Sequence, residues 1–312
     1  MNHIFTMDWH IHTLASYDAQ QSYKEVIKNT RAGGILEFGI TEHIDQPFSV
    51  LHLQFSRKMF LANYVEGMHF GVELSTWSRF QHEYAKSKKC PVYPQLYAGM
   101  LPEFVEGFGS HDPELVRLSR EQAEPWVLNL TEEQIRENKV EYVIAAAHNV
   151  YDGSEKRDEL IKHWHAQQML CATDSRVDIV GHPWTAPWTS KLHFEAIRRG
   201  SWPTENSWLE DFEVIPQAMH DEFAAALLQH EKCAELNMQF FLSGAYGDKF
   251  RHQYAEYIRG LFERGVKITT ASDYHHDNSY DEIHKLCDTY LRPAGFRAED
   301  FSKPRFRTYE GR

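Results

Sequence analysis

Short apolar runs alternate with helical patterns along most of the chain. The apolar runs have the length of buried strands and lie at residues 4–12, 35–40, 68–74, 141–147, 177–180, 238–242 and 266–270. The patterns between several of them predict helices at residues 22–32, 154–171, 214–236 and 253–264. Strands that alternate with helices indicate βα units and a parallel sheet. Seven such strands favour a closed or nearly closed α/β barrel, and an open doubly wound sheet is the competing architecture.

The stretch from Thr76 to Lys139 breaks this rhythm between the third and fourth strands. It contains aromatic residues and five prolines, at positions 91, 94, 102, 113 and 125. Near its end, Thr131 is followed three residues later by Gln134, which is a signature of a helix N-terminus. We therefore expect one barrel domain over residues 1–312, with residues 76–140 inserted either as a lid over the site or as packing elaboration.

Composition and charge fit an ordinary folded protein and narrow its partners. The chain has 312 residues, of which 42% are hydrophobic and 25% charged. Its net charge of −12 argues against a partner such as nucleic acid or an anionic membrane, which basic surfaces bind. A small anionic substrate stays compatible with this charge, because bound metal ions can make a site locally positive.

The four cysteines predict a reduced, cytoplasmic protein. Cys90, Cys171, Cys233 and Cys287 lie far apart and form no CxxC motif, so we expect mostly buried thiols. No charged-then-apolar leader opens the chain, and no apolar run approaches the roughly 18 residues of a membrane span. We therefore expect neither a secretion signal nor a transmembrane helix.

Histidines and carboxylates stand at the ends of the predicted strands. In chain order these residues are His10, His12, His43, Glu73, His148, His182, Asp273 and His275. Barrel enzymes place their catalytic groups at the C-terminal ends of the strands. Because residues i and i+2 of a strand share a face, His10 and His12 can hold one ion together, and Asp273 and His275 can act on one side.

The neighbouring histidines do not share this pattern. His163 and His165 fall in a predicted helix, where residues i and i+2 do not face each other, so we expect them to be packed or solvated. His276 should point away from His275. Imidazoles and carboxylates together suit zinc, manganese or iron. Each residue alone could be structural, as a buried His148 or a helix-capping Asp273 would be, and the whole set is what indicates a metal site.

Taken together, these motifs resemble the PHP family, the polymerase-and-histidinol-phosphatase group of metal phosphoesterases. The matching segments are Asp8-Trp9-His10-Ile11-His12-Thr13, Gly39-Ile40-Thr41-Glu42-His43, Gly71-Val72-Glu73, Ala147-His148, Gly181-His182-Pro183 and Ser272-Asp273-Tyr274-His275. They span residues 8 to about 276. The resemblance implies a distorted seven-stranded (β/α) TIM-like barrel, the PHP fold, with two to three divalent metal ions.

The resemblance also implies a ligand set for each ion. The first ion would take His10, His12, Glu73 and Asp273. Glu73 would bridge to a second ion completed by His148 and His182. A third ion would take His43, His275 and Asp18, although Asp18 could equally serve a turn or a helix cap.

Three features depart from the family pattern. Glu42 stands where the second motif usually has aspartate, and its longer side chain could still orient His43. Trp184 follows Pro183 where a polar or acidic residue is common. The insertion is also longer than in compact members. These departures bear on the substrate more than on metal binding.

The resemblance implies hydrolysis of a small phosphomonoester. A water bridging two metals, with its pKa lowered to about 7 in the best cases, would attack phosphorus in line while the metals neutralise the phosphoryl oxygens. Arg251 follows the sixth predicted strand and is either a phosphate ligand or a surface arginine. Histidinol phosphate is the best-known substrate of stand-alone family members, and the acidic balance of the chain disfavours a nucleic-acid substrate.

Two other functions fit the same residues. Related metal-dependent barrels hydrolyse C–N or carboxylic ester bonds, and ligand sets do not separate these reactions from phosphoester hydrolysis. A non-catalytic PHP-like binding module is the third reading, which the presence of the whole ligand set argues against.

Overall fold

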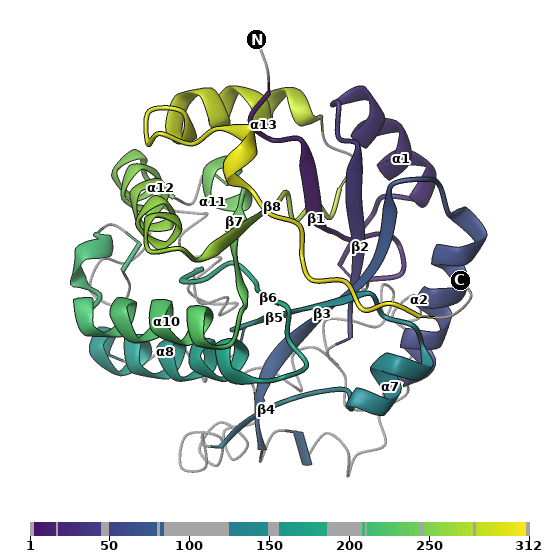
Figure 1. Ribbon diagram of the computed structural model, residues 1–312, viewed down its shortest axis with the longest axis horizontal. Helices are drawn as coiled ribbons and strands as arrows, with labels where there is room; N and C mark the ends of the chain where they lie inside the picture. The colour runs from purple at the N-terminus through teal and green to yellow at the C-terminus, as the bar shows by residue number, and fades with distance from the viewer. Residues whose placement is uncertain are drawn as a thin grey trace.

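Seven parallel strands form a nearly closed barrel with helices around it in the computed structural model (Figure 1). The structure describes residues 3–16, 18–44, 50–79, 82–83, 125–148, 156–185, 208–209, 211–243, 246–276 and 279–309. The barrel strands follow one another in the order β1 (Met7–Ile11), β2 (Glu37–His43), β3 (Met68–Ser78), β5 (Tyr142–Ala146), β6 (Ile179–Val180), β7 (Cys233–Asn237) and β8 (Lys267–Ala271).

Contacts between β1 and β8 bring the two ends of the sheet together. Ile11 forms a parallel bridge with Tyr274, and the His12 amide donates to the Tyr274 carbonyl at 3.0 Å. In addition, the Asp273 amide donates to the His10 carbonyl at 2.8 Å. The predicted barrel is therefore confirmed over an open doubly wound sheet.

The helices lie outside the barrel (Figure 1). They are α1 (Tyr23–Ala32), α2 (Val50–Asn63), α7 (Glu132–Glu137), α8 (Arg157–Thr173), α10 (Gln217–Gln229), α11 (Gln239–Leu242), α12 (Asp248–Glu263) and α13 (Tyr280–Leu286), with short helical segments at Phe212–Val214, Cys287–Leu291 and Ala298–Asp300. The predicted Thr131–Gln134 capping box begins α7, and α1 begins with another at Ser22 and Glu25. Within the described ranges, no helix is long and apolar enough to cross a membrane.

The sixth strand lies at a different place from the one we predict. The expected helix over residues 214–236 contains α10, which ends at Gln229, and β7 follows at Cys233–Asn237. The expected strand at 238–242 is instead the short helix α11. The prediction of a helix over these residues is wrong. Ala234, Glu235 and Leu236 are good helix formers, so their local preference indicated a helix where the structure has a strand. Hydrogen bonding to both β6 and β8 overrides that local preference.

The structure describes only the two ends of the predicted insertion, so residues 76–140 as an insertion stay a prediction. Strand β3 continues to Ser78, and β4 (Trp126–Leu128) pairs antiparallel with it through Trp77 and Val127. Most of the residues on which a lid depends, 84–124, lie outside the described ranges. Cys171, Cys233 and Cys287 are buried free thiols, as expected, and Cys90 also lies outside the described ranges.

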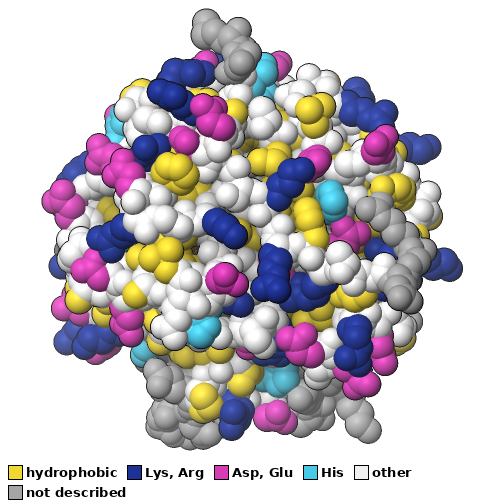
Figure 2. All heavy atoms as spheres, viewed as in Figure 1, with side chains coloured by type: hydrophobic (Ala, Val, Ile, Leu, Met, Phe, Trp, Pro, Cys, Tyr) yellow, Lys and Arg dark blue, Asp and Glu magenta, His cyan; other side chains and the backbone are white. Residues whose placement is uncertain are grey.

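The C-terminal segment crosses the end of the barrel where the strands begin (Figure 1). The Arg307 amide donates to the Glu141 carbonyl at 2.8 Å, and the Tyr309 hydroxyl donates to the Val140 carbonyl at 2.9 Å. Phe306 stacks on His69 with 4.3 Å between ring centroids. On this face, basic and acidic side chains are interspersed (Figure 2). The segment therefore covers one end of the barrel and leaves the other end for chemistry.

Gly39 makes room for a tyrosine inside the barrel, and replacing it should destabilise the fold. A Cβ at Gly39 would overlap the Tyr142 hydroxyl, which is buried and donates to the Trp9 carbonyl at 2.7 Å. We expect Gly39→Ala to lower the free energy of unfolding by about 3 kcal/mol, the upper range for overpacking. Denaturant titration measures it. Gly260→Ala is the control, because no atom lies within 4 Å of its added Cβ; equal stability of the two variants would contradict the account.

Candidate metal centre

The structure brings the nine predicted ligands into one cluster at the C-terminal ends of the barrel strands. They come from β1 and the loop after it, from β2 and β3, and from the segments that follow β5, β6 and β8: His10, His12, Asp18, His43, Glu73, His148, His182, Asp273 and His275. Because the barrel strands are parallel, their C-terminal ends all lie at the same end of the barrel. Residues more than 260 positions apart, such as His12 and Asp273, therefore meet.

Glu73 lies at the centre of the cluster. Its carboxylate is 1% exposed. One oxygen, Oε2, lies 3.2 Å from His10 Nε2 and 3.4 Å from His12 Nε2. The other oxygen, Oε1, lies 3.0 Å from His182 Nε2 and 3.4 Å from His148 Nε2. Oε2 also lies 2.9 Å from His43 Nδ1. The two oxygens of one side chain thus face separate sets of imidazole nitrogens, three at Oε2 and two at Oε1.

The first group has the spacing of a tetrahedral metal site. Asp273 Oδ1 completes it, 3.6 Å from His10 Nε2 and 3.4 Å from His12 Nε2. Four ligands placed about 2.0–2.2 Å from a tetrahedral zinc ion are about 3.3–3.6 Å from one another. The four separations given above lie close to this range. His10, His12 and Glu73 are close enough to one another to hold a metal ion, and Asp273 lies beside both histidines.

Unsatisfied atoms in the cluster support the same interpretation. His10 Nε2, His12 Nε2 and Glu73 Oε2 are buried and have no hydrogen-bond partner. Buried polar atoms without a partner are uncommon and costly. A cation among them would satisfy all three atoms at once. The chemistry of this donor set therefore fits a metal ion.

The second group consists of Glu73 Oε1 and two histidines. His148 Nε2 and His182 Nε2 lie 3.1 Å apart, and each also faces Glu73. The Ser75 hydroxyl lies 2.8 Å from His148 Nδ1 and orients that ring. Because Nδ1 is engaged, Nε2 is the atom that His148 offers to an ion. The three ligand atoms are close enough to hold a metal ion.

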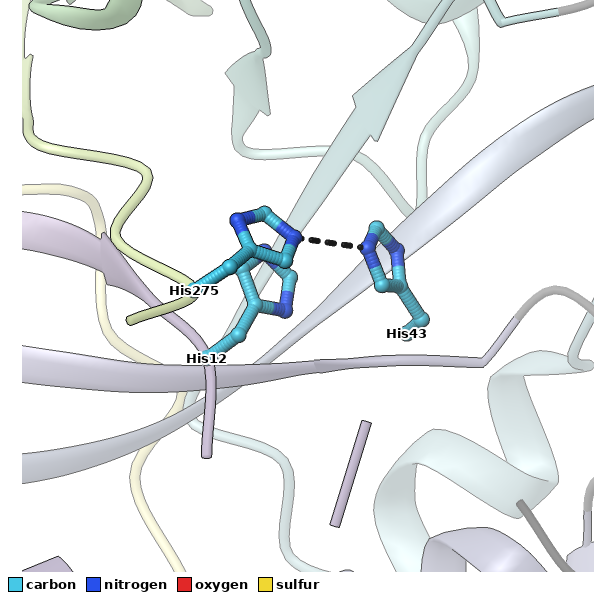
Figure 3. Close-up of side chains that lie close together, drawn as sticks. All are labelled: His12, His43 and His275. Carbon is cyan, nitrogen blue, oxygen red and sulfur yellow. Dashed lines mark hydrogen bonds between the residues drawn. The ribbon is translucent and has the colours of Figure 1, made fainter. Parts of the chain in front are cut away.

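The third group lies beside His12 and is shown in part in Figure 3. His43 Nε2 and His275 Nε2 are 3.3 Å apart, and Asp18 Oδ2 lies 3.3 Å from the first and 3.4 Å from the second. Asp18 is 38% exposed, so this group lies nearest to solvent.

His12 is close to the third group but faces the first. Its ring stacks on those of His43 and His275, with 4.2 Å between centroids in both cases. The lone pair of an imidazole nitrogen lies in the plane of the ring, so stacked rings do not direct their lone pairs at each other. We therefore assign Asp18, rather than His12, to the third group.

Glu42 holds the loop that follows β1. Its carboxylate accepts hydrogen bonds from the Ser16 hydroxyl at 2.6 Å and from the amide and hydroxyl of Thr13. Ser16 Oγ lies 3.1 Å from His12 Nδ1 and accepts from the His43 amide at 3.0 Å. Glu42 therefore acts through Ser16 on both the His12 ring and the His43 backbone, and its role in orienting His43 stays a prediction. Burial raises the pKa of Glu42 to about 7.

Strained backbone supports two of the ligands. Asp273 has a φ of 54° and His182 a φ of 25°, a region that costs energy for residues other than glycine and is often found at functional sites. The Gln239 amide group donates to the Asp273 carbonyl at 2.9 Å, and the Asn237 amide group donates to Asp273 Oδ2 at 3.1 Å. Asn237 at the end of β7 and Gln239 in α11 thus hold Asp273 in its conformation.

Two residues of the site, Glu235 and Asn237, are absent from the sequence-based set. Both lie on β7 with fully buried side chains, and Glu235 lies 2.7 Å from His10 Nδ1. The prediction placed Glu235 in a helix, where it had no reason to face the site. With β7 in its observed place, Glu235-Leu236-Asn237 repeats the i, i+2 pattern of His10-Ile11-His12 at a strand end, and that signal could have found it.

The protonation of the histidines follows their surroundings. Burial lowers the pKa of His12 to about 4 and that of His148 to about 3, so both are neutral near pH 7 and offer a lone pair. Burial also opposes protonation of His10, but the carboxylates of Glu235 and Glu73 outweigh it and raise the pKa of His10 well above its usual 6.5. Without a metal, His10 holds an extra proton between two glutamates.

Zinc affinity should fall as the pH falls, because an ion must displace the His10 proton from Nε2. The raised pKa of His10 means that the proton competes below that pKa and not above it. Affinity should weaken about tenfold per pH unit for each proton displaced. Competition with a chromophoric chelator at pH 6 and pH 7 measures this, and equal affinities would contradict it.

The other residues singled out by the sequence lie outside the cluster. Trp184 is fully buried and packs against Trp208 and His220, so it belongs to the core. Arg251 donates to the Ser243 carbonyl at 2.9 Å and lies 3.5 Å from the Tyr290 hydroxyl, and its role toward phosphate stays a prediction. His165 lies 2.9 Å from Glu222 Oε2, consistent with a packed residue.

A nearly closed α/β barrel with imidazole and carboxylate ligands at its strand ends defines a class: barrels with a candidate polynuclear metal centre. Among solved structures, the chain is similar to histidinol phosphate phosphatase from Lactococcus lactis subsp. lactis Il1403, complexed with zinc, L-histidinol and phosphate. The identity is 16%, the alignment covers 94% of both chains and the TM-score is 0.52. At this identity, the likeness shows the fold.

A second solved structure, archaeal ribonuclease P with mature tRNA, contains a chain that aligns with 94% of this one and 87% of its own length. The identity is 12% and the TM-score 0.41, too low to support an argument. No family model matches the sequence, and no curated protein matches it.

Proposed function

We propose that this chain is a metal-dependent phosphomonoester hydrolase with two to three divalent ions. The observation that carries the proposal is Glu73, whose two carboxylate oxygens face two separate groups of imidazole nitrogens at 3.0–3.4 Å. A shared carboxylate places two ions side by side, which is the arrangement of two-metal phosphoester hydrolysis. The structural likeness to a phosphatase complexed with zinc and phosphate supports the same function.

Three groups of ligands would hold the ions in this proposal, and the first two groups share Glu73. The first takes His10, His12, Glu73 and Asp273, and the second takes Glu73, His148 and His182. The third takes His43, His275 and Asp18. Zinc, manganese and iron all suit this mixture of imidazole and carboxylate, and zinc is the first to test because the similar phosphatase was solved with it.

The chain's own residues hold the reacting groups in place. Bound divalent ions supply Lewis acidity, which lowers the pKa of a coordinated water and offsets the charge on phosphoryl oxygens. The buried His10, His12 and Glu73 give this chemistry a site largely free of bulk water on the barrel side. Asp18 and His275 line the more exposed side, where a phosphate could enter. Arg251 is proposed as a further phosphate ligand.

A substrate screen tests the proposal. Metal-replete protein should release phosphate from at least one phosphomonoester in a panel that includes histidinol phosphate, since the similar phosphatase was solved with L-histidinol and phosphate. Amides, carboxylic esters and single-stranded nucleic acid form the other arms of the screen. Hydrolysis of an amide or a carboxylic ester without any phosphate release would overturn the phosphatase proposal and favour the C–N or ester hydrolase.

The variant His148→Ala tests whether phosphate release depends on the second ion. It removes one of the three atoms that face this ion, so we expect both metal content and phosphate release to fall, the latter about 100-fold or more. His165→Ala is the matched control, because this histidine binds Glu222 on α10. No change in either quantity for His148→Ala would instead support a non-catalytic module.

A further inference from the structure

Glu235 is a buried carboxylate in the middle of the barrel wall. It lies on β7, between β6 and β8, and its side chain is fully buried. Its Oε1 lies 2.7 Å from His10 Nδ1. Its Oε2 accepts from the His182 amide at 2.6 Å and from the Asn237 side-chain amide at 3.0 Å. All three groups lie in or beside the candidate metal centre.

The partners of Glu235 belong to two different ion sites. His10 is a ligand of the proposed first ion, whereas His182 is a ligand of the second. Asn237 extends the network, because its amide group also donates to Asp273 Oδ2 at 3.1 Å. One side chain therefore contacts, directly or through one residue, three ligands of the adjacent ions.

The contact with His10 determines which ring nitrogen is free. A carboxylate at Nδ1 favours the tautomer that carries the proton there, and this leaves the lone pair on Nε2. Nε2 is the atom that lies 3.2 Å from Glu73 Oε2 and 3.6 Å from Asp273 Oδ1. Glu235 thus orients the His10 ring and presents the correct atom to the first ion.

The contact with His182 supports a strained backbone. His182 has a φ of 25°, which is unfavourable for a residue with a side chain. A charge-assisted hydrogen bond from its amide to Glu235 offsets this cost. Without that bond, the segment after β6 could relax and move His182 Nε2 away from Glu73 Oε1, which lies 3.0 Å from it.

We propose that Glu235 is a positioning residue that holds the ligands of the first and second ions together, so that the two ions bind as a unit. The inference rests on the metal sites of the proposed function. It assigns Glu235 no contact with substrate. It differs from a purely structural role in one respect: changing Glu235 should weaken both ions together without unfolding the barrel.

A second carboxylate–histidine pair in the chain serves as the matched control. Glu141 Oε2 lies 2.7 Å from His69 Nδ1, the same ring atom and the same distance as in the pair of Glu235 and His10. His69 stacks on Phe306 at the other end of the barrel. The control therefore changes the same kind of contact away from the candidate metal centre.

Glu235→Gln is the sharpest test, since the amide keeps the shape of the side chain. If its oxygen faces His10, its NH2 group meets the His182 amide, and two donors then oppose each other. If its NH2 group faces His10, the His10 proton moves to Nε2 and blocks the ion. We expect zinc affinity for the first two equivalents to fall together by about 10- to 100-fold, the usual effect of losing such a partner.

Zinc titration in competition with a chromophoric chelator measures the affinity of the first and second equivalents of zinc. It is run on wild type, Glu235→Gln and Glu141→Gln. Long-range ¹⁵N–¹H NMR of the imidazoles adds the protonation of the two His10 ring nitrogens, which should change only in Glu235→Gln. Glu141→Gln should bind zinc within about twofold of wild type. Weakening of a single equivalent, or wild-type affinity in Glu235→Gln, would overturn the proposal.

Should Glu235→Gln fail to fold, Glu235→Asp keeps the charge and only shortens its reach. It should fold and still bind both equivalents of zinc about tenfold more weakly, and wild-type affinity would overturn the proposal. These titrations use zinc alone and need no substrate. Failure to hydrolyse any phosphomonoester is therefore distinguishable from failure of the role of Glu235.

Discussion

Glu73→Gln should reduce phosphate release by about 10³-fold or more, the scale of losing a central electrostatic group. The carboxylate is buried and faces five imidazole nitrogens at 2.9–3.4 Å. Glutamine removes the negative charge and replaces one oxygen with an NH2 donor, so at least one group loses its shared ligand. Metal content should therefore fall by at least one ion per chain.

Metal analysis and a turnover assay on the same preparation check this result. Glu141→Gln is a suitable control, because Glu141 adjoins β5 beside β3 but bonds to His69 at the far end of the barrel. Wild-type metal content in Glu73→Gln would show that this side chain holds no ion. Loss of metal with unchanged turnover would show that the lost ions do not take part in hydrolysis.

Removing the metals should abolish turnover and lower the melting temperature by about 10 °C. A ligand present at about 1,000 times its Kd stabilises a fold by about 4 kcal/mol, and each kcal/mol corresponds to a few degrees for a domain of this size. The physical reason is the burial of His10 Nε2, His12 Nε2 and Glu73 Oε2 in one region, where bound ions would satisfy atoms that lack a hydrogen-bond partner.

Thermal unfolding with and without a chelator measures this shift, and added zinc should restore both stability and turnover. The chelator should shift Glu73→Gln by a smaller amount, because that variant holds fewer ions from the start. Identical melting curves for wild type with and without chelator would contradict the presence of bound structural ions.

The fold and the cluster could be predicted because both follow from short-range rules. Alternating runs predict βα units, and the i, i+2 rule explains why His10 and His12 share a side of β1. Both rings reach the same oxygen, Glu73 Oε2, at 3.2 and 3.4 Å, which agrees with a shared side. Parallel topology then brings the far strand ends together without further information.

The misplaced features depend on the tertiary structure. The three central residues of β7, Ala234, Glu235 and Leu236, favour helices locally, and its position between β6 and β8 makes it a strand. Glu235 was missed for that reason. The positive φ of Asp273 and His182 leaves no sequence signal, since neither is glycine. The contact of Glu42 with Ser16 depends on the path of the loop after β1, which no periodicity predicts.

The most direct test of the account is a crystal structure of the metal-loaded protein with anomalous scattering at the zinc edge. The account predicts one peak among His10, His12, Glu73 and Asp273, and a second among Glu73, His148 and His182. A third peak should lie among His43, His275 and Asp18 where that site is filled. A zinc-replete crystal without an anomalous peak beside Glu73 would contradict the central claim that this carboxylate joins two metal sites.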